Sequence, residues 1–109
     1  DRGNARVAGI GDPLHPAVLR QIGRVIDAAH GAGKWVGLCG ELAGRPEGVP
    51  ILLGLGLDEF SMSAASIPAA KALLARLAVP DAQRLAQRVL NLPDTAAVQA
   101  EVKRFVEKL

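Results

Sequence analysis

The sequence of 109 residues contains one cysteine, no tyrosine and only three aromatic rings, Trp35, Phe60 and Phe105. A single cysteine excludes an internal disulfide bond and is typical of a reducing compartment. The 13 cationic side chains lie among 11 anionic ones, without a basic run, and stacking platforms are absent. Nucleic-acid binding is therefore not expected. No run of about 18 apolar residues is present, which argues against a membrane span.

The first residues, DRGNARVAGIGDP, lack the charged and then apolar pattern of a signal peptide, and the sequence does not start with methionine. Together with the lone cysteine, this favours a cytoplasmic protein. The sequence reads like a chain entered partway along. We therefore expect a fragment that contains one domain at most.

Half of the residues are apolar, and their spacing predicts alternating helices and strands. We expect Ser66 to cap the helix that opens at Pro68 with its hydroxyl group. The expected elements, in chain order, are a helix from Pro16 to Gly31 or Gly33, a strand at 34–39, a helix within 46–55, a strand at 58–63, and helices opening at Pro68, after Pro80 and after residues 93–95.

This order of elements predicts an α/β fold with parallel strands and right-handed crossovers. Two short parallel strands are too few for a stable sheet, because parallel sheets are buried on both faces and need several neighbouring strands. The remaining strands are expected to come from chain outside this sequence or from another copy. The architecture thus supports the fragment interpretation independently of the N-terminal residues.

Cys39 ends the first expected strand, and GELAG follows it at 40–44. In α/β folds, catalytic side chains emerge at the carboxyl ends of strands, and glycines let backbone approach a ligand closely. The alternative is a packing role, because free cysteine is among the most buried residue types. Position alone leaves both interpretations open.

Three motifs resemble Enzyme I of the bacterial sugar phosphotransferase system, the phosphoenolpyruvate–protein phosphotransferase family. They are DRGN at 1–4, KWVGLCGELAG at 34–44 and LLGLGLDEFSMSAASIP at 52–68. The resemblance runs from residue 1 to about residue 77 and is weaker over the last helices. It implies the C-terminal portion of a (β/α)8 TIM barrel. Residues 1–79 would form its last βα units, and residues 80–109 a C-terminal helical extension.

The same resemblance implies a reaction and its partners. Phosphoenolpyruvate passes its phosphoryl group to a histidine on a separate N-terminal domain, and then to a histidine phosphocarrier protein, with assistance from Mg²⁺. The metal ligands are expected upstream of this chain, so no metal site is assigned here. A homodimer is implied as well, and the fragment alone is expected to be inactive.

Two residues take roles from the family motifs. Cys39 matches the cysteine that protonates carbon-3 of the pyruvate enolate, and a thiol that is mostly protonated at neutral pH suits a general acid. Arg2 matches the arginine of DRGN that binds the substrate phosphate, for which the planar guanidinium is well shaped.

Other polar residues receive structural interpretations. We expect Glu41 to hold the loop rather than to act on the thiol, and Ser61 and Ser63 to satisfy loop backbone groups. Arg45 stands where the family commonly has an acid, which removes a helix-capping candidate and predicts a looser loop after Cys39. The remaining polar residues singled out, none with an assigned catalytic role, are Asn4, His15 and His30.

Several other functions remain open from the sequence. The Enzyme I module also occurs within multiphosphoryl transfer proteins. The string CGE is shared with pyruvate phosphate dikinases and phosphoenolpyruvate synthases, which gives a second enzymatic interpretation. A non-catalytic alternative is a dimerisation module, since the barrel is the dimerising part of the family.

Overall fold

Residues 3–7 and 11–109 are described in a computed structural model of the chain, in which two short strands lie among six α-helices. The 3₁₀-helices are η1 (Ala5–Val7) and η2 (Ala64–Ser66). The strands are β1 (Gly37–Cys39) and β2 (Glu59–Ser61). The α-helices are α1 (Pro16–Gly31), α2 (Glu41–Gly44), α3 (Gly48–Leu55), α4 (Ile67–Ala75), α5 (Val79–Val89) and α6 (Thr95–Glu107).

The strands β1 and β2 pair in parallel, as predicted, with Leu38 opposite Phe60 and Cys39 opposite Ser61. Each strand has three residues, which is shorter than the predicted segments. The pairing begins at Val36, whose carbonyl oxygen accepts from the N–H groups of Asp58 and Glu59. Each strand has only one neighbouring strand, so its ladder of hydrogen bonds stops where that neighbour stops.

The two faces of this small sheet differ. Leu38 and Phe60 are half-buried and pack against the core, whereas their strand neighbours Gly37, Cys39 and Ser61 are exposed. Alternation of this kind follows from the two-residue period of a strand. One face of the sheet is therefore covered by helices, and the opposite face, which we call the open sheet face (residues 37, 39, 59 and 61), is uncovered.

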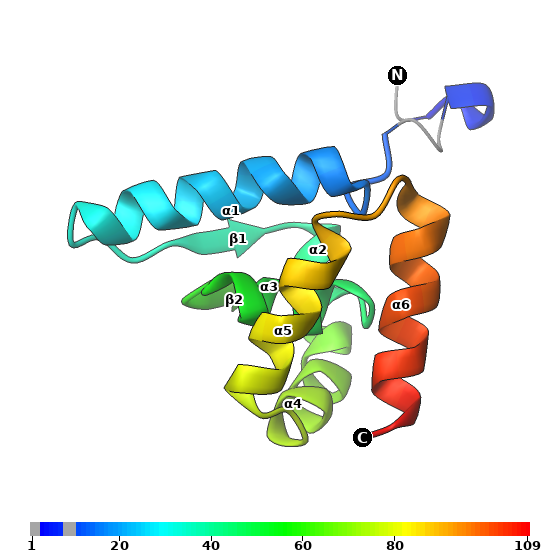
Figure 1. Ribbon diagram of the computed structural model, residues 1–109. Coiled ribbons are helices and arrows are strands. Elements are labelled where there is room, and N and C mark those ends of the chain that lie inside the picture. The colour runs from blue at the N-terminus through cyan, green and yellow to red at the C-terminus, as the bar shows by residue number, and fades with distance from the viewer. Residues whose placement is uncertain (1–2, 8–10) are drawn as a thin grey trace.

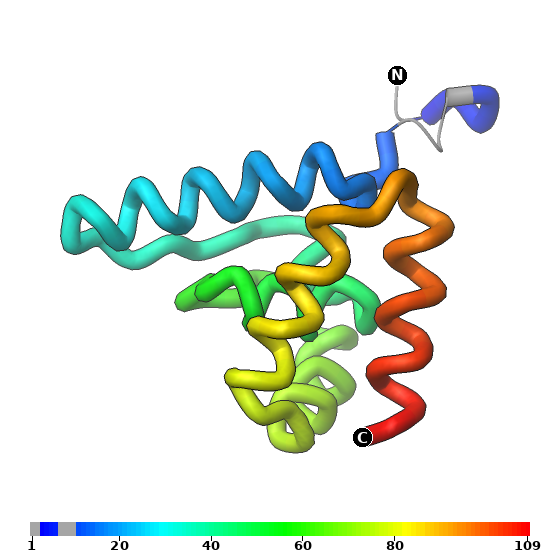
Figure 2. The backbone as a smooth tube through the Cα atoms, viewed as in Figure 1, coloured from blue at the N-terminus to red at the C-terminus, as the bar shows by residue number. Residues whose placement is uncertain are grey.

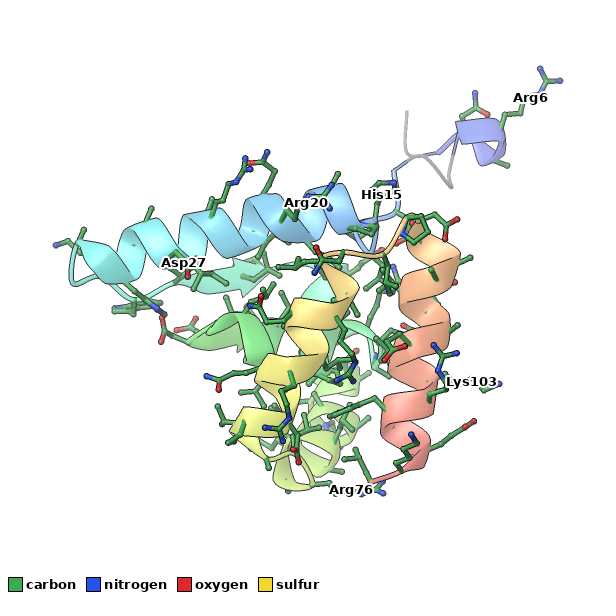
Figure 3. The ribbon with its side chains drawn as sticks, viewed as in Figure 1. Arg6, His15, Arg20, Asp27, Arg76 and Lys103 are labelled. Carbon is green, nitrogen blue, oxygen red and sulfur yellow. The ribbon has the colours of Figure 1, made fainter. Side chains whose placement is uncertain are left out.

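The hydrophobic core lies between the covered sheet face and the helices. Helix α3 contacts both α1 and α5, and Figure 1 shows α6 beside this group at the C-terminal end of the chain. Arg20 Nη1 on α1 donates to Leu90 O at 2.7 Å, which links α1 to the end of α5 (Figure 3). The buried core residues are Leu14, Leu19, Ile26, Leu42, Ile51, Leu52, Leu57, Leu85, Val89, Val98 and Val102.

Helix α1 begins and ends where the sequence predicts. Pro16 is its first residue, and the preceding His15 accepts from Ala17 N through Nδ1. After the helix the chain reverses direction (Figure 2). Gly33 has a φ of 73° there, and Lys34 N donates to Ala29 O at 2.8 Å. A left-handed residue at this place is the usual way to end a helix, and glycine adopts it without strain.

Two local predictions are wrong. Residues 41–44, expected as a loop, form α2, because Leu42 and Ala43 are buried against the core and this burial outweighs the glycines on either side. Ser66 does precede α4, but its hydroxyl makes no capping hydrogen bond and instead lies 3.1 Å from Ser63 Oγ. Local side-chain pairing has replaced the expected cap.

His30 and Asp58 tie the end of α1 to the start of β2. His30 Nε2 lies 2.7 Å from Asp58 Oδ2, which also accepts from Val36 N at 2.8 Å. The hydrogen bond from His30, and then that from Val36, lower the pKa of Asp58. A lowered carboxyl pKa stabilises the fold above the ordinary pKa of aspartate, and this contribution is lost as the pH falls through the lowered value.

Gly54 allows the close crossing of α3 over α5. A Cβ atom at Gly54 would lie 2.0 Å from the Ala82 carbonyl oxygen and 2.5 Å from its carbonyl carbon. Both are backbone atoms, so no side-chain rotation can relieve the contact. This packing role depends on where α5 lies and is evident only in the folded chain.

We expect Gly54→Ala to destabilise the protein by about 1–3 kcal/mol, because α5 must shift away from α3. Gly31→Ala is the matched control, since nothing lies within 4 Å of a Cβ at that helical position. Urea unfolding of both variants measures the difference. Equal stability of Gly54→Ala and the unmodified protein would contradict the observed α3–α5 crossing.

Candidate active site

The carboxyl ends of β1 and β2 meet at one edge of the sheet, where Cys39 is paired with Ser61. The Cys39 thiol is free and exposed, and Ser61 is exposed beside it on the open sheet face. Within the described residues the Cys39 side chain does not pack in the core, because it lies on the sheet face opposite to the one that the helices cover. The predicted position of the thiol at a strand end is confirmed.

The segment after Cys39 is tightly constrained. Gly40 has a φ of 118°, a conformation that side chains other than glycine rarely adopt. Helix α2 starts at the next residue and is held by the buried residues Leu42 and Ala43. The thiol thus lies between a paired strand and an anchored helical turn, which limits how far it can move.

A hollow of about 560 Å³ lies at the carboxyl ends of the two strands. Its lining comes from residues 40–41 and 44–46 after β1, and from Ser61 at the end of β2 with residues 62–63 and Ser66 after it. Cys39 itself does not line the hollow, but it directly precedes the lining residue Gly40. The volume is within the usual range for small-molecule sites, and the position at the carboxyl ends of parallel strands is typical of α/β enzymes.

The second glycine of GELAG serves protein packing. A Cβ at Gly44 would lie 3.1 Å from Met62 Cβ and 3.2 Å from Ser66 Cβ. The end of α2 therefore approaches the loop after β2 too closely for a side chain to fit easily. The glycines of GELAG were expected to let the backbone approach a ligand. At Gly44 the backbone instead approaches Met62 and Ser66 of the same chain.

Arg45 closes one side of the hollow. Its Nη1 lies 3.0 Å from Asp12 Oδ1, and its Nε lies 3.4 Å from Glu47 Oε2. Its carbonyl oxygen accepts from Gly48 N and Val49 N at the start of α3. Without an acid at this position, the loop was expected to lack a helix cap. In the fold, the Arg45 carbonyl oxygen accepts from the first N–H groups of α3, and the Arg45 side chain joins the loop to Asp12.

The other residues considered in the sequence analysis fall into three groups. Arg2 lies outside the described residues, so its relation to Cys39 is not described. Glu41 and Ser61 line the hollow. Asn4 Oδ1 accepts from Arg6 N at 3.0 Å, which gives it a local turn-forming role.

Sequence reasoning missed Asp12 and Met62. Nothing in the sequence relates Asp12 to Arg45, 33 positions away. Met62 could have been inferred as a lining residue, because it directly follows the second strand. The Asp12–Arg45 contact carried no comparable local signal.

Within residues 3–7 and 11–109, no group of three or more histidine, cysteine, aspartate or glutamate side chains is placed to hold a metal ion. The described part of the chain therefore does not provide a Mg²⁺ site by itself. Over the same residues, no helix is both long and apolar enough to cross a membrane.

Comparison with known proteins identifies the family. Residues 1–79 match the family described as PEP-utilising enzyme, PEP-binding domain. The chain belongs to this family. The match includes β1, β2 and all residues that line the hollow.

Among the relatives are three proteins named phosphoenolpyruvate-protein phosphotransferase. The chain is 57% identical over 104 residues to the one from Geobacillus stearothermophilus, which covers 95% of the chain. It is 50% identical over 103 residues to that of Bacillus subtilis and 51% identical over 102 residues to that of Haloferax volcanii, each covering 94% of the chain. The chain spans 18% of the length of each of these relatives.

Proposed function

We propose that this chain is the C-terminal part of a phosphoenolpyruvate–protein phosphotransferase, with Cys39 as the proton donor. The observation that carries the proposal is the exposed thiol at the carboxyl end of β1, within the segment that matches the PEP-binding family. The high identity to the named phosphotransferases favours this activity over a dikinase or a synthase.

The proposal includes the barrel. In a (β/α)8 barrel, strands alternate between residues that face the barrel interior and residues that face the surrounding helices. Leu38 and Phe60 pack against helices, while the neighbours on the open sheet face are uncovered. We assign that open face to the barrel interior, with β1 and β2 as its last two strands. This arrangement places Cys39 at the catalytic end of the barrel.

The reaction can be written for this chain's own residues. The bond between the phosphorus and the enol oxygen of phosphoenolpyruvate breaks, and the phosphoryl group passes to a histidine of another domain. The electron pair that remains forms the enolate of pyruvate. The Cys39 thiol donates its proton to carbon-3 of this enolate and becomes a thiolate, which water then reprotonates. Arg2 would hold the phosphate oxygens through its guanidinium group.

The remaining parts of the proposal rest on the family resemblance. They are a homodimeric enzyme in the cytoplasm, a histidine phosphocarrier protein as the phosphoryl acceptor of the second step, and Mg²⁺ as the metal ion. When bound, Mg²⁺ neutralises charge on the phosphoryl group. We assign its ligands to the rest of the protein, since the described residues contain no group of three or more histidine, cysteine, aspartate or glutamate side chains placed to hold a metal ion.

The proposal is tested by incubating the complete protein with phosphoenolpyruvate that carries a labelled phosphoryl group. We expect pyruvate to be released and the label to appear on a histidine of the same protein, because the two products come from one bond cleavage. Pyruvate assay and mass spectrometry of the labelled peptide measure them. Release of inorganic phosphate in place of a labelled histidine would contradict the proposal, and nucleotide-dependent labelling would indicate a dikinase or synthase.

A further inference from the structure

The ion pair between Asp12 and Arg45 joins two segments that are distant in the sequence. Asp12 precedes α1, and Arg45 follows α2, directly after the segment that carries Cys39. Arg45 Nη1 lies 3.0 Å from Asp12 Oδ1, and the side chains of Arg45 and Asp12 are 27% and 22% exposed. Partial burial reduces the screening of this ion pair by solvent.

Both partners are held in place by further hydrogen bonds. Asp12 Oδ1 also accepts from Leu14 N at 2.9 Å, and Leu14 is fully buried. On the other side, Arg45 N donates to Leu42 O at 3.2 Å, and Arg45 O accepts from Gly48 N at 2.9 Å. The ion pair therefore connects two anchored backbone turns and can transmit their relative position.

Helix α2 depends on such outside support. It has four residues, and a helix of that length is not stable by itself because nucleation is costly. It connects to Cys39 through Gly40, whose backbone conformation would be strained for any other residue. Buried side chains hold the middle of α2, and Arg45 holds its end. Loss of the ion pair would let the turn move, and the thiol at its start would move with it.

We infer that Asp12 and Arg45 are positioning residues that set where the Cys39 thiol lies relative to the start of α1. In its catalytic consequence, this inference rests on the proposed role of Cys39 as proton donor. Arg45 and Asp12 carry opposite charges, so removal of either charge alone breaks the ion pair.

Three variants of the complete protein test this inference. Asp12→Asn keeps an acceptor for Leu14 N but removes the charge, Arg45→Gln removes the other charge, and a double variant with Asp12→Arg and Arg45→Asp reverses the pair. Arg88→Gln is the matched control, because Arg88 Nε pairs with Glu101 Oε1 at 2.8 Å between α5 and α6, outside the hollow. Thermal unfolding of each variant monitors folding.

The first measurement is the rate constant for alkylation of Cys39 by iodoacetamide, followed on the peptide that contains it. We expect each single variant to change this rate constant about threefold or more, and to lower kcat for pyruvate formation about tenfold with little change in KM, because small displacements of a reacting group are costly. The reversed pair restores opposite charges but removes the acceptor for Leu14 N, so it is expected to recover part of both losses. The control should match the unmodified protein.

Unchanged alkylation in the single variants, or a reversed pair no better than the singles, would overturn the inference. A changed alkylation rate with unchanged kcat would overturn it as well. If Asp12→Asn fails to fold, Asp12→Glu replaces it, and if Arg45→Gln fails to fold, Arg45→Lys replaces it. Each replacement keeps the charge but changes the geometry of the pair, so the same two quantities are expected to change in the same direction by a smaller factor. If the unmodified protein forms no pyruvate, the proposed function fails, and the alkylation series with its charge-reversal rescue decides the positioning role by itself.

Discussion

Replacing Cys39 with alanine in the complete protein is expected to slow pyruvate formation from phosphoenolpyruvate about 10²–10⁴-fold, the usual contribution of a general acid. The thiol is free and lies at the end of β1, on the sheet face opposite to the helices, so the substitution removes the proton donor without disturbing the core between the sheet and the helices. Transfer of the phosphoryl group between the acceptor histidine and the carrier protein should stay near its normal rate, because that step needs no carbon protonation.

Val79→Ala is the control for Cys39→Ala. Val79 is 49% exposed at the start of α5 and lies outside both the hollow and the open sheet face. We expect this variant to form pyruvate at close to the normal rate, measured in a coupled pyruvate assay. Proton exchange into pyruvate, followed by NMR, should be lost only in Cys39→Ala. If both half-reactions fail together in a folded Cys39→Ala protein, the thiol is not the proton donor.

The isolated 109-residue chain is expected to release no pyruvate from phosphoenolpyruvate and to associate with itself. Phosphoryl transfer requires positioned groups and charge neutralisation, and the described residues provide an exposed thiol without a metal cluster. The open sheet face and the unpaired strand edges are sites for association. Exposed apolar side chains add to them, with Val25 60% and Trp35 69% exposed.

Two measurements on the isolated chain decide this prediction. Light scattering over a range of concentrations gives the mass of the species, which we expect to exceed that of one chain. A pyruvate-release assay is expected to stay at the background rate, while the complete protein serves as the positive control. A cooperative melt of a monomer, or release of pyruvate above background, would show that the chain needs no partner strands.

Residue patterns were sufficient for much of the secondary structure. The bounds of α1, the parallel strands and the helical character of the C-terminal region were all predicted, because each depends on apolar spacing and on glycine or proline within a few positions. The short helix α2 was not predicted. Its glycine-rich segment indicates a loop, and only burial of Leu42 and Ala43 against distant residues makes it helical.

The same division holds for the candidate site. The position of Cys39 at the end of a strand followed from a short apolar run and the glycine after it, and both are local features. The exposure of its thiol depends on which sheet face the helices cover, and the Asp12–Arg45 ion pair depends on a contact across 33 positions. Local sequence specifies the elements through hydrogen bonds and side-chain spacing along the chain. Which faces and charges meet is decided by packing between elements, and only the folded chain contains that information.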